Sequence, residues 1–283
     1  MRLGLSTPVV VQLPGVASPW ETEAGIADLA RISAVADDLA FDYLTCSEHV
    51  AVPSQDVADR GAVYWDPLAT LGFLAAHTRR IRLATSVLVL GYHHPLEIAK
   101  RYGTLDRVSA GRLVLGVGIG SLKAEFELID APWQERAARA DDALRALRAS
   151  LSSATSSYHG PFYDYEDMTV LPHAEQQQVP IWVGGRSAGS LRRAVEFADG
   201  WMPFGLSLES VRDLLDGVDL PTEFDVLLSA TVNPEADPVG TRKRLVTLRD
   251  AGATAVTCAV RADSVDHYCE QLARLRDIEE QCS

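Results

Sequence analysis

Short apolar runs alternate with longer amphipathic segments along almost the whole chain. The short runs have the length of β-strands, and in the longer segments apolar residues recur every three or four positions, as on one face of an α-helix. Such alternation predicts βα units that build a parallel sheet. Eight runs have the strand pattern: Leu3–Thr7, Phe41–Cys46, Ile81–Leu90, Leu113–Val117, Val179–Val183, Gly200–Pro203, Phe224–Val232 and Ala255–Val260.

Capping residues indicate where several helices begin. Ser18, Pro19 and Glu21 have the spacing of a capping box with a proline in the first turn, so we expect the first helix to begin there. The other clear helices are expected at Asp66-Pro67, from Pro95 to Gly111, over Glu135–Leu151 and over Ser264–Arg276.

Eight strands joined by helices favour an α/β fold of the (β/α)8 TIM-barrel type. The competing architecture is a doubly wound sheet, which would place a glycine-rich turn after the first strand. Ser6-Thr7-Pro8 stands there instead. Barrels of about 250 residues form one domain, so we expect residues 1–283 to form a single barrel domain.

The regular alternation breaks after the fourth strand. Residues 152–172 are rich in serine and aromatic residues and have no place in a βα unit. Long insertions of this kind commonly act as binding loops or lids. We therefore expect an inserted loop or lid at 152–172, with Tyr163 and Tyr165 closing over a substrate.

Composition and charge limit the range of partners. The 283 residues include 39 acidic and 26 basic side chains, a net charge of −13, which does not suit binding to a phosphate backbone. No apolar run approaches the roughly 20 residues that a membrane helix needs, and the N-terminus lacks the pattern of a signal peptide. We expect a cytoplasmic enzyme that acts on a small-molecule substrate, with no nucleic-acid or membrane partner.

The four cysteines, Cys46, Cys258, Cys269 and Cys282, are scattered and suggest no disulfide framework. This usage is typical of a reducing compartment. Cys46 and Cys258 lie in apolar strand-like runs and are expected to be small core residues.

The active site of a (β/α)8 barrel lies at the carboxyl ends of its strands. His49 follows the second strand and is a candidate proton donor or hydrogen-bond donor to a ring, with a structural loop histidine as the alternative. His93 and His94 follow the third strand. Adjacent side chains diverge and no HxH or HExxH pattern is present, so we expect no metal there and place His94 beside a helix N-cap.

Glycine-rich turns follow the fourth and fifth strands. Gly116 and Gly118 would let a planar or anionic ligand approach the backbone, with tight strand–helix packing as the alternative. Gly184-Gly185-Arg186-Ser187 leads directly into a helix, where free N–H groups, two glycines and a cation predict a phosphate cradle. After the sixth strand, Trp201 could stack on a ring or fill the barrel.

Several blocks together resemble the luciferase-like monooxygenase superfamily, from about Leu3 to Pro203. Within it the chain is most similar to oxidoreductases that use the deazaflavin coenzyme F420, because Ser47-Glu48-His49 matches their Ser-Asp-His motif with one change. The blocks that carry the resemblance are Ala84–Val89, His94-Pro95, Thr104–Leu113, Gly116-Val117-Gly118, Tyr158–Tyr163, Pro180–Ser187 and Ala198–Trp201.

The resemblance implies where a cofactor would bind. Members carry a strained, often cis, peptide at the end of the third strand that supports one face of the cofactor ring, here Ser86-Val87. His49 would be the catalytic residue, which hydrogen-bonds the ring or protonates the substrate. The implied cofactor-binding residues are Ser47, Thr85, Ser86, Val87, Gly116, Gly118, Gly184, Gly185, Arg186 and Ser187.

Two departures from the family pattern limit the implied chemistry. Sugar-phosphate dehydrogenases of this branch carry a glutamate at the position of Ser121 and a tryptophan near Pro53, and this chain has neither. The resemblance therefore argues against sugar-phosphate oxidation and against a catalytic carboxylate at position 121.

The function implied is hydride transfer between F420 and an unidentified small organic substrate with an electron-poor C=C, C=N or C=O bond. A monooxygenase that uses reduced FMN is the first alternative. A barrel that binds a flavin without turnover is an alternative of another class, and a metal-dependent hydrolase is disfavoured because no ligand set is present. The resemblance also implies a homodimer.

Overall fold

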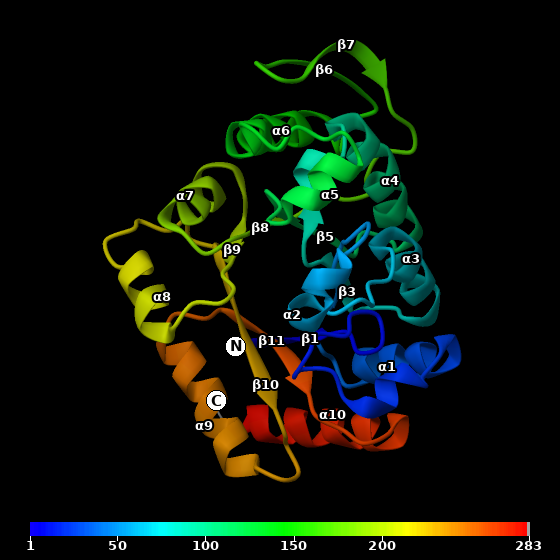
Figure 1. The fold of residues 1–283 in the computed structure, drawn as a ribbon, viewed down its shortest axis with the longest axis vertical. Coiled ribbons are helices and arrows are strands. Elements are labelled where there is room, and N and C mark those ends of the chain that lie inside the picture. Colours follow the sequence, from blue (N-terminus) through cyan, green and yellow to red (C-terminus); the bar gives the residue numbers. More distant parts are fainter. Residues whose placement is uncertain (282–283) are drawn as a thin grey trace.

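Within residues 1–281, which the computed structural model describes, eight parallel strand positions close into a barrel surrounded by helices (Figure 1). The pairing order is β1-β2-β3-β5-β8-β9-β10-β11, and β11 returns to β1. The predicted (β/α)8 barrel is confirmed, and every predicted run overlaps one strand position. The strands are β1 (Arg2–Ser6), β2 (Tyr43–Cys46), β3 (Arg82–Thr85), β5 (Leu113–Gly118), β8 (Ile181–Gly184), β9 (Gly200–Met202), β10 (Asp225–Val232) and β11 (Ala255–Val260).

The third predicted strand is divided in two. β3 is followed by the short β4 (Leu88–Val89), and the Ser86–Val87 peptide between them is cis, as the resemblance implied. β3 and β4 both pair with β5, first at Leu83 and later at Leu88. The backbone therefore leaves the regular ladder at Ser86 and Val87, which are only partly buried.

Helices follow the strands and cover the outside of the barrel (Figure 1). Four of the five predicted helix starts are confirmed, at α3, α4, α6 and α10. Asp66 accepts from the amide of Ala69, and Ser264 accepts from that of His267. The helices are α1 (Ile26–Asp38), α2 (Val57–Arg60), α3 (Pro67–His77), α4 (Pro95–Val108), α5 (Lys123–Leu128), α6 (Arg136–Ser150), α7 (Ala188–Phe197), α8 (Leu208–Leu215), α9 (Pro238–Asp250) and α10 (Val265–Glu280), with 3-10 turns η1 (Pro19–Thr22), η2 (Ser54–Asp56) and η3 (Leu90–Tyr92).

The predicted start of the first helix is wrong. Ser18 caps only η1, and α1 begins later, after Gly25, whose amide donates to Asp28. Glu21 explains the difference, because its buried carboxylate accepts from the amides of both Ser18 and Val9. The Ser18 and Glu21 pair therefore stabilises the loop after β1, and the amphipathic helix does not begin there.

Two apolar layers stabilise the barrel. An inner layer fills it, with Tyr43, Trp182 and Met202 as its largest members, and Val87 packs against this layer. A larger outer layer lies between strands and helices. Cys46 and Cys258 are buried, as predicted, whereas Cys282 lies outside the described residues.

Charged side chains close the amino-terminal end of the barrel. Arg2 pairs with Asp42 and Asp225, and Arg82 pairs with Asp42. The fully buried indole of Trp182 donates its Nε1 hydrogen to Asp225 Oδ2 at 3.1 Å. These contacts join four strands at the end opposite to the predicted site.

The segment predicted as an inserted loop is an antiparallel hairpin of β6 (Thr155–His159) and β7 (Asp164–Thr169), which lies beside α6 at one extremity of the molecule (Figure 1). Buried Asp142 of α6 accepts from the amides of Phe162 and Tyr163 and from the Tyr158 hydroxyl. The hairpin tip is therefore tied to α6.

Candidate active site

His49 lies at the carboxyl end of the barrel, just after β2, and is mostly buried. Its Nδ1 lies 2.7 Å from Glu125 Oε2, and its ring packs edge-on against Tyr64 at 4.4 Å between ring centroids. Its Nε2 has no hydrogen-bond partner within residues 1–281. One ring nitrogen is thus held, and the other is available to a ligand.

Glu125 of α5 is the centre of this arrangement, and its side chain is only 1% exposed. Oε1 accepts from the amides of Val50 (2.6 Å) and Ala51 (3.2 Å), and Oε2 accepts from the Tyr92 hydroxyl at 2.8 Å. Burial by itself would raise the pKa of Glu125, but these donors and His49 outweigh burial and leave its pKa below the ordinary value. The carboxylate is therefore ionised at neutral pH.

Phe126, the next residue, fixes the position of Glu125. Its fully buried ring lies between Gly91 and Gly120 and packs against Tyr92 and Trp133. A Cβ at Gly91 would lie 2.7 Å from the ring and one at Gly120 2.5 Å, and Gly120 also has a φ of +78°. The two glycines therefore make room for Phe126, which anchors α5.

The neighbouring Glu48 and His93 form a second, structural pair. Glu48 Oε1 lies 2.7 Å from His93 Nε2, and Oε2 accepts from the amide of Val89 at 2.7 Å. His94 points elsewhere and is itself the N-cap of α4, where Nδ1 accepts from the amide of Leu96. The two adjacent histidines therefore diverge, as predicted.

The predicted polar residues around the cis peptide hold the backbone. Ser47 donates its hydroxyl to the Ser86 carbonyl at 2.6 Å, and Thr85 donates to the Gly116 carbonyl at 2.6 Å. The amide of Ser86 donates to the Cys46 carbonyl. These contacts bring Ser47, Thr85, Ser86 and Val87 together beside His49.

The glycines in the last part of β5 and at the end of β8 are needed for packing. A Cβ at Gly118 would lie 2.7 Å from Val87, and one at Gly184 would lie 2.8 Å from the other methyl of Val87. A Cβ at Gly116 would overlap the Thr85 carbonyl. Close packing against Thr85 and Val87 therefore accounts for these three glycines without a ligand, whereas the alternative considered for Gly116 and Gly118 was packing between strand and helix.

The predicted phosphate cradle leads directly into α7, as expected. Ser187 caps the helix through a capping box with Ser190, while Arg186 is exposed and lies over the Phe204 ring at 5.9 Å. Gly185 has no room for a side chain because of Ser190. Trp201 is fully buried against α7, where its Nε1 donates to Ser190, so it does not stack on a ligand ring.

Thr7 is a further polar residue at this end of the barrel. It directly follows β1 and is 2% exposed, yet its hydroxyl has no hydrogen-bond partner among residues 1–281. Buried hydroxyls normally find a partner. This atom is consistent with a ligand at the carboxyl end.

Sequence reasoning missed Glu125 and Thr7. Glu125 lies four residues beyond Ser121, in a short polar segment without a strand or cap pattern, so no spacing pointed to His49. Ser121 is itself exposed, with Arg60 at 3.5 Å, and Pro53 precedes η2. The site does contain a carboxylate, but it belongs to Glu125 and not to position 121.

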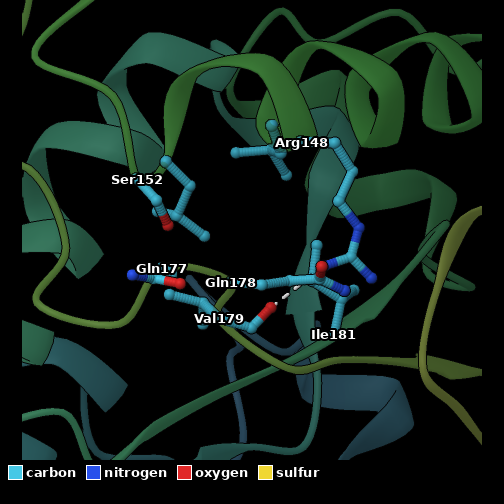
Figure 2. A pocket seen from close by; sticks show the side chains of 8 residues that line it. Arg148, Ser152, Gln177, Gln178, Val179 and Ile181 are labelled. Atoms are coloured by element: carbon cyan, nitrogen blue, oxygen red, sulfur yellow. Dashed lines mark hydrogen bonds between the residues drawn. The ribbon is translucent and has the colours of Figure 1, made fainter.

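A cavity of about 200 Å³ lies at the amino-terminal end of the barrel, opposite to His49, between the end of α6 and the segment before β8 (Figure 2). Arg148 lines it, but its guanidinium donates to the carbonyls of Val179 and Phe197 and to Asp199. The cation is thus already satisfied. The cavity is separate from the His49 site.

Residues 1–281 contain no cluster of three or more histidine, cysteine or acidic side chains arranged to hold a metal ion. None of their helices combines the length and apolar character required to span a bilayer.

The chain is similar to known proteins along most of its length. The family model described as luciferase-like monooxygenase matches residues 1–255. An F420-dependent glucose-6-phosphate dehydrogenase of Microbacterium testaceum is 31% identical over 183 residues, which cover 63% of this chain and 52% of that protein. An FMNH2-dependent dimethylsulfone monooxygenase of Pseudomonas putida is 28% identical over 197 residues, covering 67% of this chain and 52% of that protein.

The chain spans about half the length of these two relatives. In three dimensions, a monooxygenase from Streptomyces bottropensis superposes with a TM-score of 0.73 and 22% identity, covering 98% of both chains. That likeness concerns the fold, and the family match covers the strands and loops that build the site. This chain belongs to the luciferase-like monooxygenase family.

Proposed function

We propose that this protein is an oxidoreductase that transfers a hydride between bound coenzyme F420 and a small organic substrate, with His49 handling the accompanying proton. The observation that carries the proposal is the geometry of His49, whose Nδ1 is fixed by Glu125 while Nε2 has no partner within residues 1–281. Family membership supports a flavin-type or deazaflavin cofactor, because named relatives use F420 or reduced FMN.

The residues at the carboxyl end suit a flat ring with an anionic side chain. Ser86 and Val87 are partly exposed and would support one face of the ring, held in place by Ser47 and Thr85. The first amides of α7, with Gly185, Arg186 and Ser187, would hold a phosphate. Gly116, Gly118 and Gly184 would contribute only by leaving the space that the Val87 side chain and the Thr85 carbonyl occupy.

The deazaflavin would supply the hydride, which amino-acid side chains cannot provide. His49 would donate or accept a proton at Nε2, since Nδ1 is directed to an ionised carboxylate. Glu48 has no proton role in this proposal, because both of its oxygens are engaged with His93 and Val89. The same arrangement would serve a reduced FMN monooxygenase, the second candidate.

The hairpin contributes to the proposal through one tyrosine. Tyr163 packs against His94 at the start of α4, with 5.4 Å between ring centroids, so we propose that it borders the substrate entrance. The prediction that Tyr165 closes over a substrate is wrong, because its buried hydroxyl is hydrogen-bonded to Ser150 and Ala146. We further propose a homodimer, which size-exclusion chromatography with light scattering would test.

Titration of the purified protein with F420 and, separately, with FMN tests the cofactor through ring fluorescence. We expect tight binding of F420 and binding of FMN at least tenfold weaker. The reverse order would favour the monooxygenase. Binding of neither would refute the proposed cofactor site at Ser86 and the start of α7.

Replacement of His49 tests the proton role once a reducible carbonyl, imine or activated alkene has been found by following cofactor absorbance. The variant His49→Asn should lower kcat by about 10²- to 10⁴-fold, because general acid–base catalysis contributes that much. The Kd of the cofactor should change by less than about threefold. An unchanged kcat would remove His49 from the mechanism.

A further inference from the structure

We propose that Glu125 is a positioning residue that fixes the tautomer of His49, so that Nδ1 carries a proton and Nε2 is the nitrogen that exchanges protons with the ligand. The catalytic use of Nε2 rests on the proposed function. The tautomer itself follows from the hydrogen bonds of Glu125 and can be tested without any cofactor.

The hydrogen-bond inventory of Glu125 sets the direction of the His49 contact. Its two oxygens accept from two backbone amides and from the Tyr92 hydroxyl. Donors on both oxygens, together with its lowered pKa, favour an ionised carboxylate, which can only accept. The 2.7 Å contact to His49 therefore requires a hydrogen on Nδ1.

The surrounding packing keeps this geometry in place. Glu125 is 1% exposed, so water does not compete for its oxygens. Phe126 anchors α5 between Gly91 and Gly120, and Tyr64 packs against the His49 ring. With Nδ1 directed to Glu125, Nε2 is the only ring nitrogen of His49 left to a ligand.

A glutamine at position 125 would reverse the arrangement. Its amide oxygen would take the hydrogen bonds from the Val50 and Ala51 amides, since these two donors cannot turn away. Its NH2 group would then face Nδ1 and would need Nδ1 to accept. Neutral His49 would then carry its proton on Nε2, so the nitrogen that faces the ligand could donate a hydrogen bond but could no longer accept a proton.

Nuclear magnetic resonance of histidine nitrogens tests this directly. The complete protein, labelled with ¹⁵N-histidine, would be measured at pH 8.5, where an imidazole is ordinarily neutral, with His49→Asn used to assign the signals. We expect a protonated Nδ1 on His49 in the unmodified protein and an unprotonated Nδ1 in Glu125→Gln. Glu127→Gln is the matched control, because Glu127 lies on the same helix, is mostly exposed and pairs with Lys123 on the surface.

Three outcomes separate the possibilities. An unprotonated Nδ1 in the unmodified protein would overturn the proposal, even if Glu125→Gln failed to fold. The same protonation pattern in Glu125→Gln would also overturn it. A reversal in Glu125→Gln but not in Glu127→Gln would support it.

Activity provides the second readout. With an identified substrate, Glu125→Gln should lower kcat by about 10²-fold or more, while the Kd of the cofactor changes by less than about threefold. If neither F420 nor FMN binds but the tautomer is as expected, the proposed function fails and the positioning role of Glu125 stands.

Discussion

Phe126 and the two glycines around it show how one residue can determine the position of another. The ring fills the space that side chains at Gly91 and Gly120 would occupy, and Glu125 precedes it on a helix of six residues. So short a helix has little stability of its own. The position of the buried carboxylate therefore depends on a neighbouring apolar side chain.

Truncation of this ring should destabilise the protein. Phe126→Ala is expected to lower the free energy of unfolding by about 3–5 kcal/mol, the usual cost of removing a buried phenylalanine ring. Urea unfolding followed by circular dichroism would measure it. Phe204→Ala is the control: Phe204 is 54% exposed, so its removal should change stability by less than about 0.5 kcal/mol. Equal effects of the two variants would contradict the anchoring role of Phe126.

A buried aspartate gives a pH-dependent prediction. Asp37 at the end of α1 accepts from the amides of Arg79, Arg80 and Ile81 before β3. Burial alone would raise its pKa, but the three amide donors lower the pKa below the ordinary 3.8. A carboxylate with a lowered pKa in the folded state adds stability above the unfolded-state pKa, and this stability is lost as pH falls through the folded pKa.

Asp37→Asn should therefore be less stable at pH 7 by about 1–3 kcal/mol. The gap to the unmodified protein should persist down to about pH 4 and close as the solution becomes more acidic. Thermal unfolding from pH 7 to pH 2 would show it. Asp38→Asn alters the neighbouring exposed aspartate and should leave the curve unchanged; a constant gap for Asp37→Asn at all pH values would contradict the assignment.

At the scale of elements, the barrel could be predicted because the strands are short, mostly apolar runs and because apolar residues recur every three or four positions in the helices between them. The end of the third strand could not be predicted from hydrophobicity, since Ser86 and Val87 lie inside the single strand-like run Ile81–Leu90, and only the family resemblance indicated the cis peptide. The first helix was placed too early because Glu21 bonds within a loop. Glu125 was missed because its partners come from distant segments.

The hairpin is expected to depend on Asp142. This fully buried carboxylate holds the tip through Tyr158, Phe162 and Tyr163. Asp142→Ala should speed amide exchange of residues 158–163 by about tenfold or more, because each lost hydrogen bond to a charged group is worth roughly 1.5–3 kcal/mol. Hydrogen–deuterium exchange with mass spectrometry would measure this.

Asp164→Ala provides the comparison on the hairpin itself. Asp164 is exposed and pairs with the exposed His159, so the exchange rate of the tip should change little. If both variants exchanged at the same rate, Asp142 would not be the residue that ties the tip to α6.

At the scale of the whole molecule, the two ends of the barrel carry different kinds of residue. The carboxyl end holds His49 and Glu125, while the amino end holds the charged cluster of Arg2, Asp42, Arg82 and Asp225. This division is typical of (β/α)8 enzymes, in which one end serves chemistry and the other stability.

Asp225→Ala tests this separation. The variant removes the acceptor of the buried Trp182 Nε1, so the free energy of unfolding should fall by about 1–3 kcal/mol. The Kd of F420 or FMN should stay within about twofold, as measured by fluorescence titration. A large loss of cofactor affinity in a folded variant would show that the two ends are coupled.

The paired ends of the hairpin bear on how such proteins diversify. The amide of Val170 donates to the carbonyl of Ala154 at 2.9 Å, so the segment leaves and rejoins the rest of the chain at neighbouring points. A segment of this kind can lengthen, shorten or be exchanged without changing the distance between α6 and β8. The segment can therefore be replaced as a unit during evolution. Chimeras joined at Ala154 and Val170 would vary the segment while the barrel sequence stays the same.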